Sequence, residues 1–129
     1  MRRLAPTLLL LLSLTALPVR AAEPPRRFVV FFGEWSAGFD SAALAVIHDA
    51  AQWALAHPDD TVTVTGAADL TGSRKANLLL SDLRAQVVAD QLAQDGLPEQ
   101  RVKLVGLGSV GYTLSPQESR RVIVTIAAP

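Results

Sequence analysis

The sequence has no cysteine among its 129 residues. This absence excludes a structural disulfide, and it excludes the cysteine through which bacterial lipoproteins receive their lipid. We therefore expect a protein that is not a lipoprotein and that folds without covalent cross-links. The chain is long enough to bury a hydrophobic core of its own.

An excess of charge of either sign is also lacking, because 12 Lys and Arg balance 12 Asp and Glu. Three of the bases lie in the amino-terminal 21 residues, and without that segment the net charge is −3. The basic residues form no cluster larger than the pairs Arg26-Arg27, Arg74-Lys75 and Arg120-Arg121. We therefore expect no nucleic acid among the partners.

The leucine-rich run Leu8–Leu14 is too short to span a bilayer. It follows Met-Arg-Arg and precedes Val19 and Ala21, the small residues expected before a signal-peptidase cut. This pattern predicts a secreted, periplasmic protein without a transmembrane segment in its mature form. The expected division is a signal peptide at 1–21, a short linker at 22–27 and one domain at 28–129.

The first half of the domain predicts a strand and a helix. The continuous apolar run Phe28–Phe32 is typical of a central strand that is buried on both faces. A helix is expected from about Ser41 to Ala56, with Asp40 as its cap. The predicted core stripe of this helix is Leu44, Ile47, Ala51 and Leu55.

The second half repeats the pattern. Val62 and Val64 alternate with threonines in a strand at Thr61–Thr65, and a turn-rich segment, 66–72, leads into a helix at about Arg74–Gln94. Ser73 or Thr71 is its expected cap. The predicted core stripe of this helix is Leu79, Leu80, Leu83, Val87 and Leu92.

Two more strands are expected near the carboxyl terminus, at Arg101–Val105 and Arg121–Ile126, antiparallel to each other. The glycines between them spell G-x-G-x-x-G, but no helix and no acidic residue follow as a dinucleotide site requires, so we interpret 106–111 as a flexible loop. The order is strand, helix, strand, helix, strand, strand. It predicts an α+β fold in which two helices cover one face of a mixed four-stranded sheet.

Polar residues on the second helix suggest a binding site. Asn77, Ser81 and Arg84 lie at i, i+4 and i+7, and the lean of helical side chains points Arg84 back toward Asp69 in the preceding turn. An exposed carboxylate and guanidinium in this arrangement can bind a zwitterion. The alternative is that Asp69 accepts hydrogen bonds from turn amides and Arg84 is a solvated helix residue.

No catalytic, metal or cofactor site is expected. His48 has no second histidine or cysteine at ligand spacing, and His57 is the expected end of the first helix. Trp35 and Trp53 are expected to pack at the core or its edge, although an exposed Trp35 can stack on a sugar. We find no nucleophile with a base, so we expect a protein that is not an enzyme.

The run G-A-A-D-L-T-G, followed by Asn77 and L-S-D-L-R-A, resembles the peptidoglycan-associating domain of the OmpA, Pal and MotB group. V-G-L-G (105–108) and S-R-R-V (119–122) are similar to two further motifs of that family. The resemblance covers about residues 28–126. It implies the same α+β layout, a cell-envelope location at the wall beneath the outer membrane, and no enzymatic activity.

The resemblance also implies a ligand, the free amino-acid end of meso-diaminopimelate in the peptidoglycan stem. Asp69 would meet the ammonium and Arg84 the carboxylate, with Asn77 and Arg120 in support. Ala67 and Ala68 depart from the family pattern, in which His-Thr is usual. The open alternative is therefore a periplasmic protein-interaction module that kept the fold and lost the wall ligand.

Overall fold

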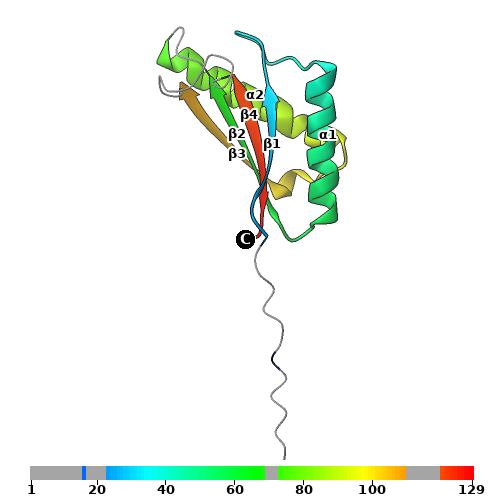
Figure 1. The fold of residues 1–129 in the computed structure, drawn as a ribbon. Coiled ribbons are helices and arrows are strands. Elements are labelled where there is room, and N and C mark those ends of the chain that lie inside the picture. Colours follow the sequence, from blue (N-terminus) through cyan, green and yellow to red (C-terminus); the bar gives the residue numbers. More distant parts are fainter. Residues whose placement is uncertain (1–15, 17–22, 69–72, 110–119) are drawn as a thin grey trace, which may run out of the picture.

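The computed structural model describes residue 16 and residues 23–68, 73–109 and 120–129 (Figure 1). Seven elements follow one another in this part of the chain. They are β1 (Arg26–Phe31), α1 (Ser41–Ala56), β2 (Thr61–Ala68), α2 (Arg74–Gln94), the 3₁₀ turn η1 (Glu99–Arg101), β3 (Val102–Ser109) and β4 (Arg121–Ala127).

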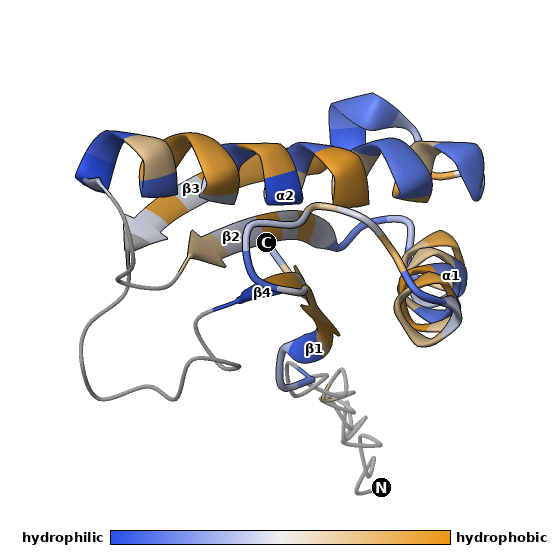
Figure 2. Cartoon of the chain, turned by 90° about the horizontal axis from the view of Figure 1, so that it is seen from above, coloured by the Kyte–Doolittle hydropathy of each residue, from blue (hydrophilic) through white to orange (hydrophobic). Residues whose placement is uncertain are grey.

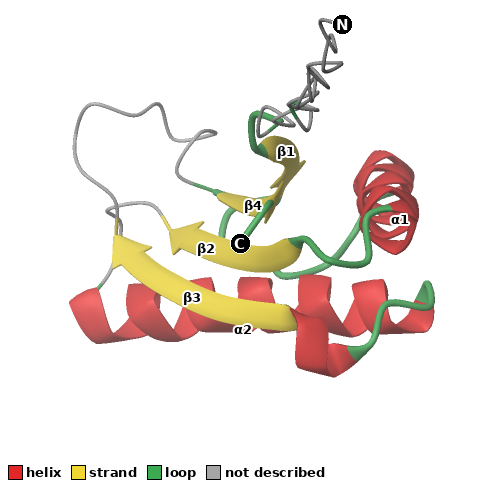
Figure 3. Ribbon diagram, turned by 90° about the horizontal axis from the view of Figure 1, so that it is seen from below, coloured by secondary structure: helices red, strands yellow, loops and turns green. Residues whose placement is uncertain are grey.

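The four strands form one mixed sheet in the order β1-β4-β2-β3. Strand β4 runs antiparallel to both of its neighbours, whereas β2 and β3 are parallel and are joined by α2. Both helices lie on the same side of the sheet, with α2 along β2 and β3 and α1 beside β1 (Figures 2 and 3). The predicted α+β fold is confirmed.

The prediction for the first strand is wrong, because β1 lies at an edge of the sheet and is buried on one face only. Val30 and Phe32 enter the core, while Val29 and Phe31 are 36% and 44% exposed on the other face. The central position belongs to β4, which inserts between β1 and β2. A continuous apolar run therefore did not indicate burial on both faces here.

Helix α1 begins as predicted, since the Asp40 carboxylate accepts a hydrogen bond of 2.7 Å from the Ala43 amide. Its predicted stripe is half right. Ile47 and Ala51 are buried, but Leu44 and Leu55 are each 42% exposed. Their places in the core are taken by small residues, Ala43, Ala50 and Ala54. Alanine on the inner face brings the helix backbone close to the sheet.

Helix α2 has the predicted bounds and the predicted cap. Ser73 Oγ accepts a hydrogen bond of 3.0 Å from the Ala76 amide. The predicted core stripe, however, is wrong at Leu79 and Leu83, which are 60% and 50% exposed. Leu80 is half-buried, Val87 packs against the core, and Leu92 is fully buried. The buried face of α2 consists of Asn77, Ser81, Arg84, Ala85, Val88 and Leu92.

Glycines in the sheet explain why a small and polar helix face turns inward. A Cβ on Gly66 would overlap the backbone oxygen of Ser81, and a Cβ on Gly106 would overlap the Asp82 carboxylate. Gly108, at φ +66°, has the backbone of Leu78 nearby, and its amide donates to Ser81 Oγ at 2.8 Å. The first half of α2 thus lies against glycines of the sheet, where a leucine would not fit.

Strand β3 is longer than expected and starts one residue later, at Val102. Gly106 and Gly108 belong to this strand, so the prediction of a flexible loop at both positions is wrong; Gly111 lies outside the described residues. Strands β3 and β4 run in opposite directions as predicted, but they are not neighbours, because β2 lies between them.

Arg101, expected to start the third strand, instead holds the end of α1. Its guanidinium donates to the carbonyl oxygens of Ala54, His57 and Asp60 at 2.7, 2.9 and 3.0 Å. His57 is the C-cap of α1, as predicted. Among the described helices, neither is long and apolar enough to cross a membrane.

Candidate functional site

The polar row of α2 consists of Asn77, Ser81 and Arg84. It lies at the end of the sheet where β2 ends. The structure describes Asn77, Arg84 and Arg120, whereas Asp69 lies outside the described residues. The expected pairing of Asp69 with Arg84 therefore stays a prediction. Asn77, Ser81 and Arg84 do share one helix face, but that face is turned toward the sheet.

Arg84 is buried, with 1% of its surface exposed, so the expectation of an exposed guanidinium is wrong. Its Nε donates to Ser36 O at 2.9 Å, one terminal nitrogen donates to Ala67 O at 3.1 Å, and the other donates to Gly33 O at 2.9 Å. The guanidinium carbon also lies 5.4 Å from the centre of the Phe32 ring. One side chain thus connects α2 to the end of β2 and to the segment after β1.

These contacts fix the orientation of the cation. The three acceptors are backbone carbonyl oxygens, of Ser36, Ala67 and Gly33. A positive charge that is held in a fixed position at low dielectric attracts a carboxylate more strongly than the same charge in water. The geometry therefore suits recognition of an anionic group at this end of the sheet.

Asn77 is buried to the same degree, with 1% exposure. Neither its amide nitrogen nor its carbonyl oxygen has a hydrogen-bond partner among the described residues. A buried polar group in this state costs about 1–3 kcal/mol. Asn77 therefore has unmet capacity both to donate and to accept, two turns before Arg84 on the same helix face.

Arg120 reaches the same end of the molecule from the start of β4. Its side chain forms an ion pair of 3.8 Å with Glu34, and its carbonyl oxygen accepts a hydrogen bond of 2.8 Å from the Phe32 amide. The segment Gly33–Ser36 thus contacts both arginines, since Arg84 donates to Gly33 and Ser36. The structure brings Arg84 and Arg120 to one segment.

The sequence patterns did not identify the segment Gly33–Ser36 as part of the site. It contributes backbone carbonyls, which every residue has, so no sequence pattern indicates the ones that bind an arginine. Trp35 within it is 51% exposed and adopts φ +51°, an unusual conformation for a residue with a side chain. The expectation that Trp35 packs in the core or at its edge is wrong, whereas Trp53 packs against the core.

The Ala67-Ala68 pair lies within β2 and is buried, at 3% and 0% exposure. The Ala67 carbonyl is one of the acceptors of Arg84. Ala67 therefore takes part in positioning the arginine through its backbone.

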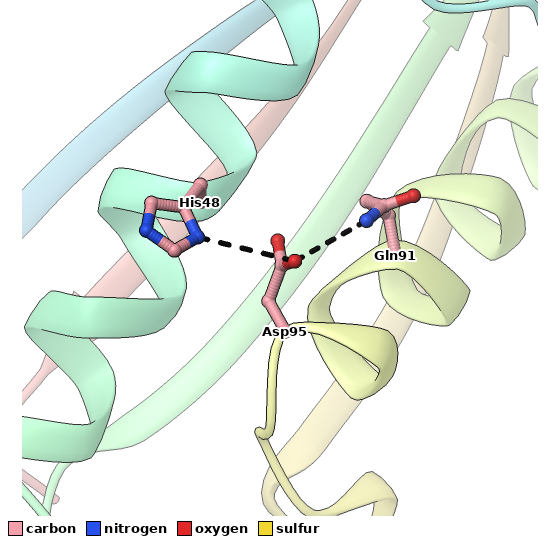
Figure 4. Close-up of polar contacts among 3 residues, drawn as sticks. All are labelled: His48, Gln91 and Asp95. Atoms are coloured by element: carbon pink, nitrogen blue, oxygen red, sulfur yellow. Dashed lines mark hydrogen bonds and ion pairs between the residues drawn. The ribbon is translucent and has the colours of Figure 1, made fainter.

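His48 lies at the middle of α1, beside the carboxyl end of α2. Its Nδ1 lies 3.9 Å from a carboxylate oxygen of Asp95, whose carboxylate also accepts a hydrogen bond of 3.3 Å from Gln91 (Figure 4). His57 stacks on Trp53, with 4.3 Å between the ring centres. No group of three metal-binding side chains occurs in the parts of the chain that the structure describes.

The fold and the polar row define a two-layer α+β domain with its candidate site where the end of β2 packs against α2. More particularly, the chain belongs to the OmpA family, whose sequence profile matches residues 31–122. Among solved structures, it resembles the OmpA-like domain of FopA1 from Francisella tularensis, with a TM-score of 0.73 and 23% identity over 81% of this chain and 73% of that one. It also resembles the peptidoglycan-associated lipoprotein from Burkholderia pseudomallei, with a TM-score of 0.70 and 24% identity over 76% of this chain and 88% of that one.

Two curated relatives are more similar in sequence. The chain is 35% identical to the peptidoglycan-associated lipoprotein of Agrobacterium fabrum over 79 residues, which are 61% of this chain and 45% of the relative. It is 38% identical to the peptidoglycan-binding protein ArfA of Mycobacterium bovis over 81 residues, 63% of this chain and 25% of the relative. The chain thus matches less than half the length of either relative.

Proposed function

We propose that this chain binds peptidoglycan non-covalently and recognises the diaminopimelate of its stem peptide. The observation that carries the proposal is the buried row of α2, where an oriented cation, Arg84, and an amide with unmet hydrogen bonds, Asn77, share one helix face. The names of the Agrobacterium and Mycobacterium relatives support the polymer as ligand.

The residues have distinct expected roles. The carboxylate of the zwitterion would meet Arg84, and its ammonium would meet Asp69, the only acidic residue between β2 and α2 in the sequence. Asn77 would donate to and accept from the same ligand, which would satisfy its buried amide. Arg120 would add a second cation beside Glu34. Each of these roles is binding, so we propose a non-enzymatic protein.

We propose the periplasm as its location, in contact with the wall. The Agrobacterium relative is named a lipoprotein. The sequence of this chain contains no cysteine for such a lipid, so the expectation of a protein that is not a lipoprotein stays a prediction.

The test is co-sedimentation of the secreted protein with diaminopimelate-containing sacculi. Asn77→Ala is the sharpest variant, because its side chain has no partner among the described residues and alanine is the better helix former. We expect its free energy of unfolding to stay the same or to rise by about 1 kcal/mol, while wall binding falls.

Arg84→Gln and Asp69→Asn complete the series, and we expect each to weaken binding at least about tenfold. Arg101→Gln is the matched control for Arg84→Gln, because it also removes three bonds to carbonyls, at the opposite end of the sheet. Folded Arg101→Gln should bind like the wild type. Wild-type protein that stays in the supernatant would overturn the proposal and favour the protein-interaction module.

A further inference from the structure

The face of the sheet that points away from both helices is uncovered in the described structure (Figures 2 and 3). Paired residues of neighbouring strands point to the same side of a sheet, so the register defines this open face. Val29 pairs with Ile123, Ile123 pairs with Thr65, and Thr65 pairs with Val105, which gives one row across all four strands. This row is mostly apolar, and Phe31 extends it at 44% exposure.

The charged strand residues of the open face, in the part of the chain that the structure describes, are all basic. Arg27 and Lys103 are exposed at its two edges, in the row that contains Thr63 and Thr125. Arg121 pairs with Phe31 in a third row, on the opposite side of the apolar row. The four strands contain no aspartate or glutamate. The acidic residues that the structure describes lie instead on helices, turns and the segments between elements.

The open face adjoins the candidate site. Arg120 and Arg121 are consecutive; Arg120 pairs with Glu34 beside the site, and Arg121 points to the open face. Likewise Phe31 lies on the open face, and Gly33, two residues later, accepts a hydrogen bond from Arg84. A polymer that is bound at the site can therefore continue onto this face.

The positive charge and the apolar side chains of the open face indicate which kind of partner it can bind. A second copy in a face-to-face dimer would bring Arg27 and Lys103 against another set of cations, which is unfavourable. A polyanion with apolar groups complements both features. Peptidoglycan is such a polymer, because its stems carry carboxylates and its sugar rings and acetyl methyl groups can pack on Phe31 and the valines.

We propose that the open face is a second contact surface for the peptidoglycan polymer, outside the diaminopimelate site. This inference rests on the proposed function, because it takes the same polymer as partner. The face adds electrostatic attraction that depends on salt, and it makes intact wall a better ligand than an isolated stem.

The experiment compares two ligands, intact sacculi and a soluble disaccharide-tetrapeptide that contains diaminopimelate. The test variant is Arg27→Gln/Lys103→Gln, with Phe31→Ser as a second variant that keeps the charge. Arg26→Gln is the matched control, because this neighbour on β1 points to the other face and its guanidinium lies 4.3 Å from the ring centre of Trp53. All proteins are purified after secretion and checked for folding by circular dichroism.

At low salt we expect the double variant to bind sacculi about fivefold more weakly than the wild type and to bind the soluble fragment equally well. Phe31→Ser should also weaken sacculus binding, whereas Arg26→Gln should bind both ligands like the wild type. Sacculus binding of the wild type should fall as salt is raised, and that of the double variant should fall less.

Equal sacculus binding by the double variant and the wild type would overturn the inference and leave the proposed function intact. An equal loss in Arg26→Gln would also overturn it, since net charge would then explain the effect. Sacculus binding without fragment binding would support the open face and contradict the diaminopimelate site. Wild-type protein that binds phosphatidylglycerol vesicles but no sacculi would assign the face to a membrane and overturn the inference.

Discussion

Arg84 has a structural role that neither interpretation of the sequence includes. It was expected to be either a ligand-binding residue or a solvated helix residue, and both interpretations assumed an exposed side chain. The guanidinium is instead buried and bound to the carbonyls of Gly33, Ser36 and Ala67. Two of these acceptors lie 48 and 51 residues away in sequence, which no local pattern can reveal.

This burial predicts that Arg84→Ala destabilises the fold. Three carbonyls, one in a buried bond and two in part-buried bonds, would lose a charged donor, and we expect the free energy of unfolding to fall by about 3 kcal/mol. Urea denaturation followed by circular dichroism measures the change. Arg101→Ala, which removes the same number of carbonyl contacts from a partly buried site, should cost about 2 kcal/mol. An unchanged midpoint for Arg84→Ala would show that its contacts are not needed for stability.

At the scale of elements, α2 shows why a hydrophobic period can indicate a helix and still misassign its face. The leucines at 79, 80 and 83 recur at helical spacing, yet the part of the sheet that faces residues 78–85 of α2 contains Gly66, Gly106 and Gly108. A surface without side chains accepts the small residues Ser81 and Ala85 at close range. The helix is therefore rotated so that Leu79 and Leu83 point to solvent.

The rotation predicts unequal costs for two leucine truncations in the same helix. Leu92→Ala opens a cavity at a position with 0% exposure and should lower the free energy of unfolding by about 3 kcal/mol. Leu83→Ala, at 50% exposure, should change it by less than about 0.5 kcal/mol. Thermal and urea unfolding of both variants measure the difference. A similar fall in the free energy of unfolding at the two positions would contradict this rotation and support the core stripe that the sequence predicts.

The close approach of α2 also predicts different tolerance at two glycines. A Cβ on Gly66 meets the Ser81 backbone oxygen, which is fixed within the helix, so Gly66→Ala should cost about 3 kcal/mol or prevent folding. A Cβ on Gly106 meets first the side chain of Asp82, which is exposed and can rotate away. We expect Gly106→Ala to cost about 1 kcal/mol. The order of the two unfolding midpoints is the test.

For the whole molecule, cleavage of the amino-terminal segment is a prediction that rests on the sequence alone. Residues 17–22 include the expected cleavage site and lie outside the described structure. We expect the secreted protein to begin at Ala22, and Ala21→Phe to block processing because a large residue does not suit the position before the cut. Intact mass of the periplasmic fraction measures both. A secreted wild-type protein that retains residues 1–21 would contradict the predicted division of the chain.

The sequence by itself determined the features that depend on neighbours within a few positions. Asp40 and Ser73 cap their helices as predicted, and α2 has the predicted bounds. The row of Asn77, Ser81 and Arg84 shares one face, as its spacing requires. These outcomes follow from local hydrogen bonds and from the helical period, which the chain specifies without reference to distant residues.

The tertiary structure decided which faces are buried and which strands are neighbours. The position of β1 at the edge depends on β4, about 90 residues later, inserting beside it. The burial of Arg84 depends on carbonyls from the segment after β1 and from the end of β2. Burial depends on two surfaces in contact. The sequence pattern of a helix determines its period, whereas the surface that the helix packs against determines which of its faces is buried.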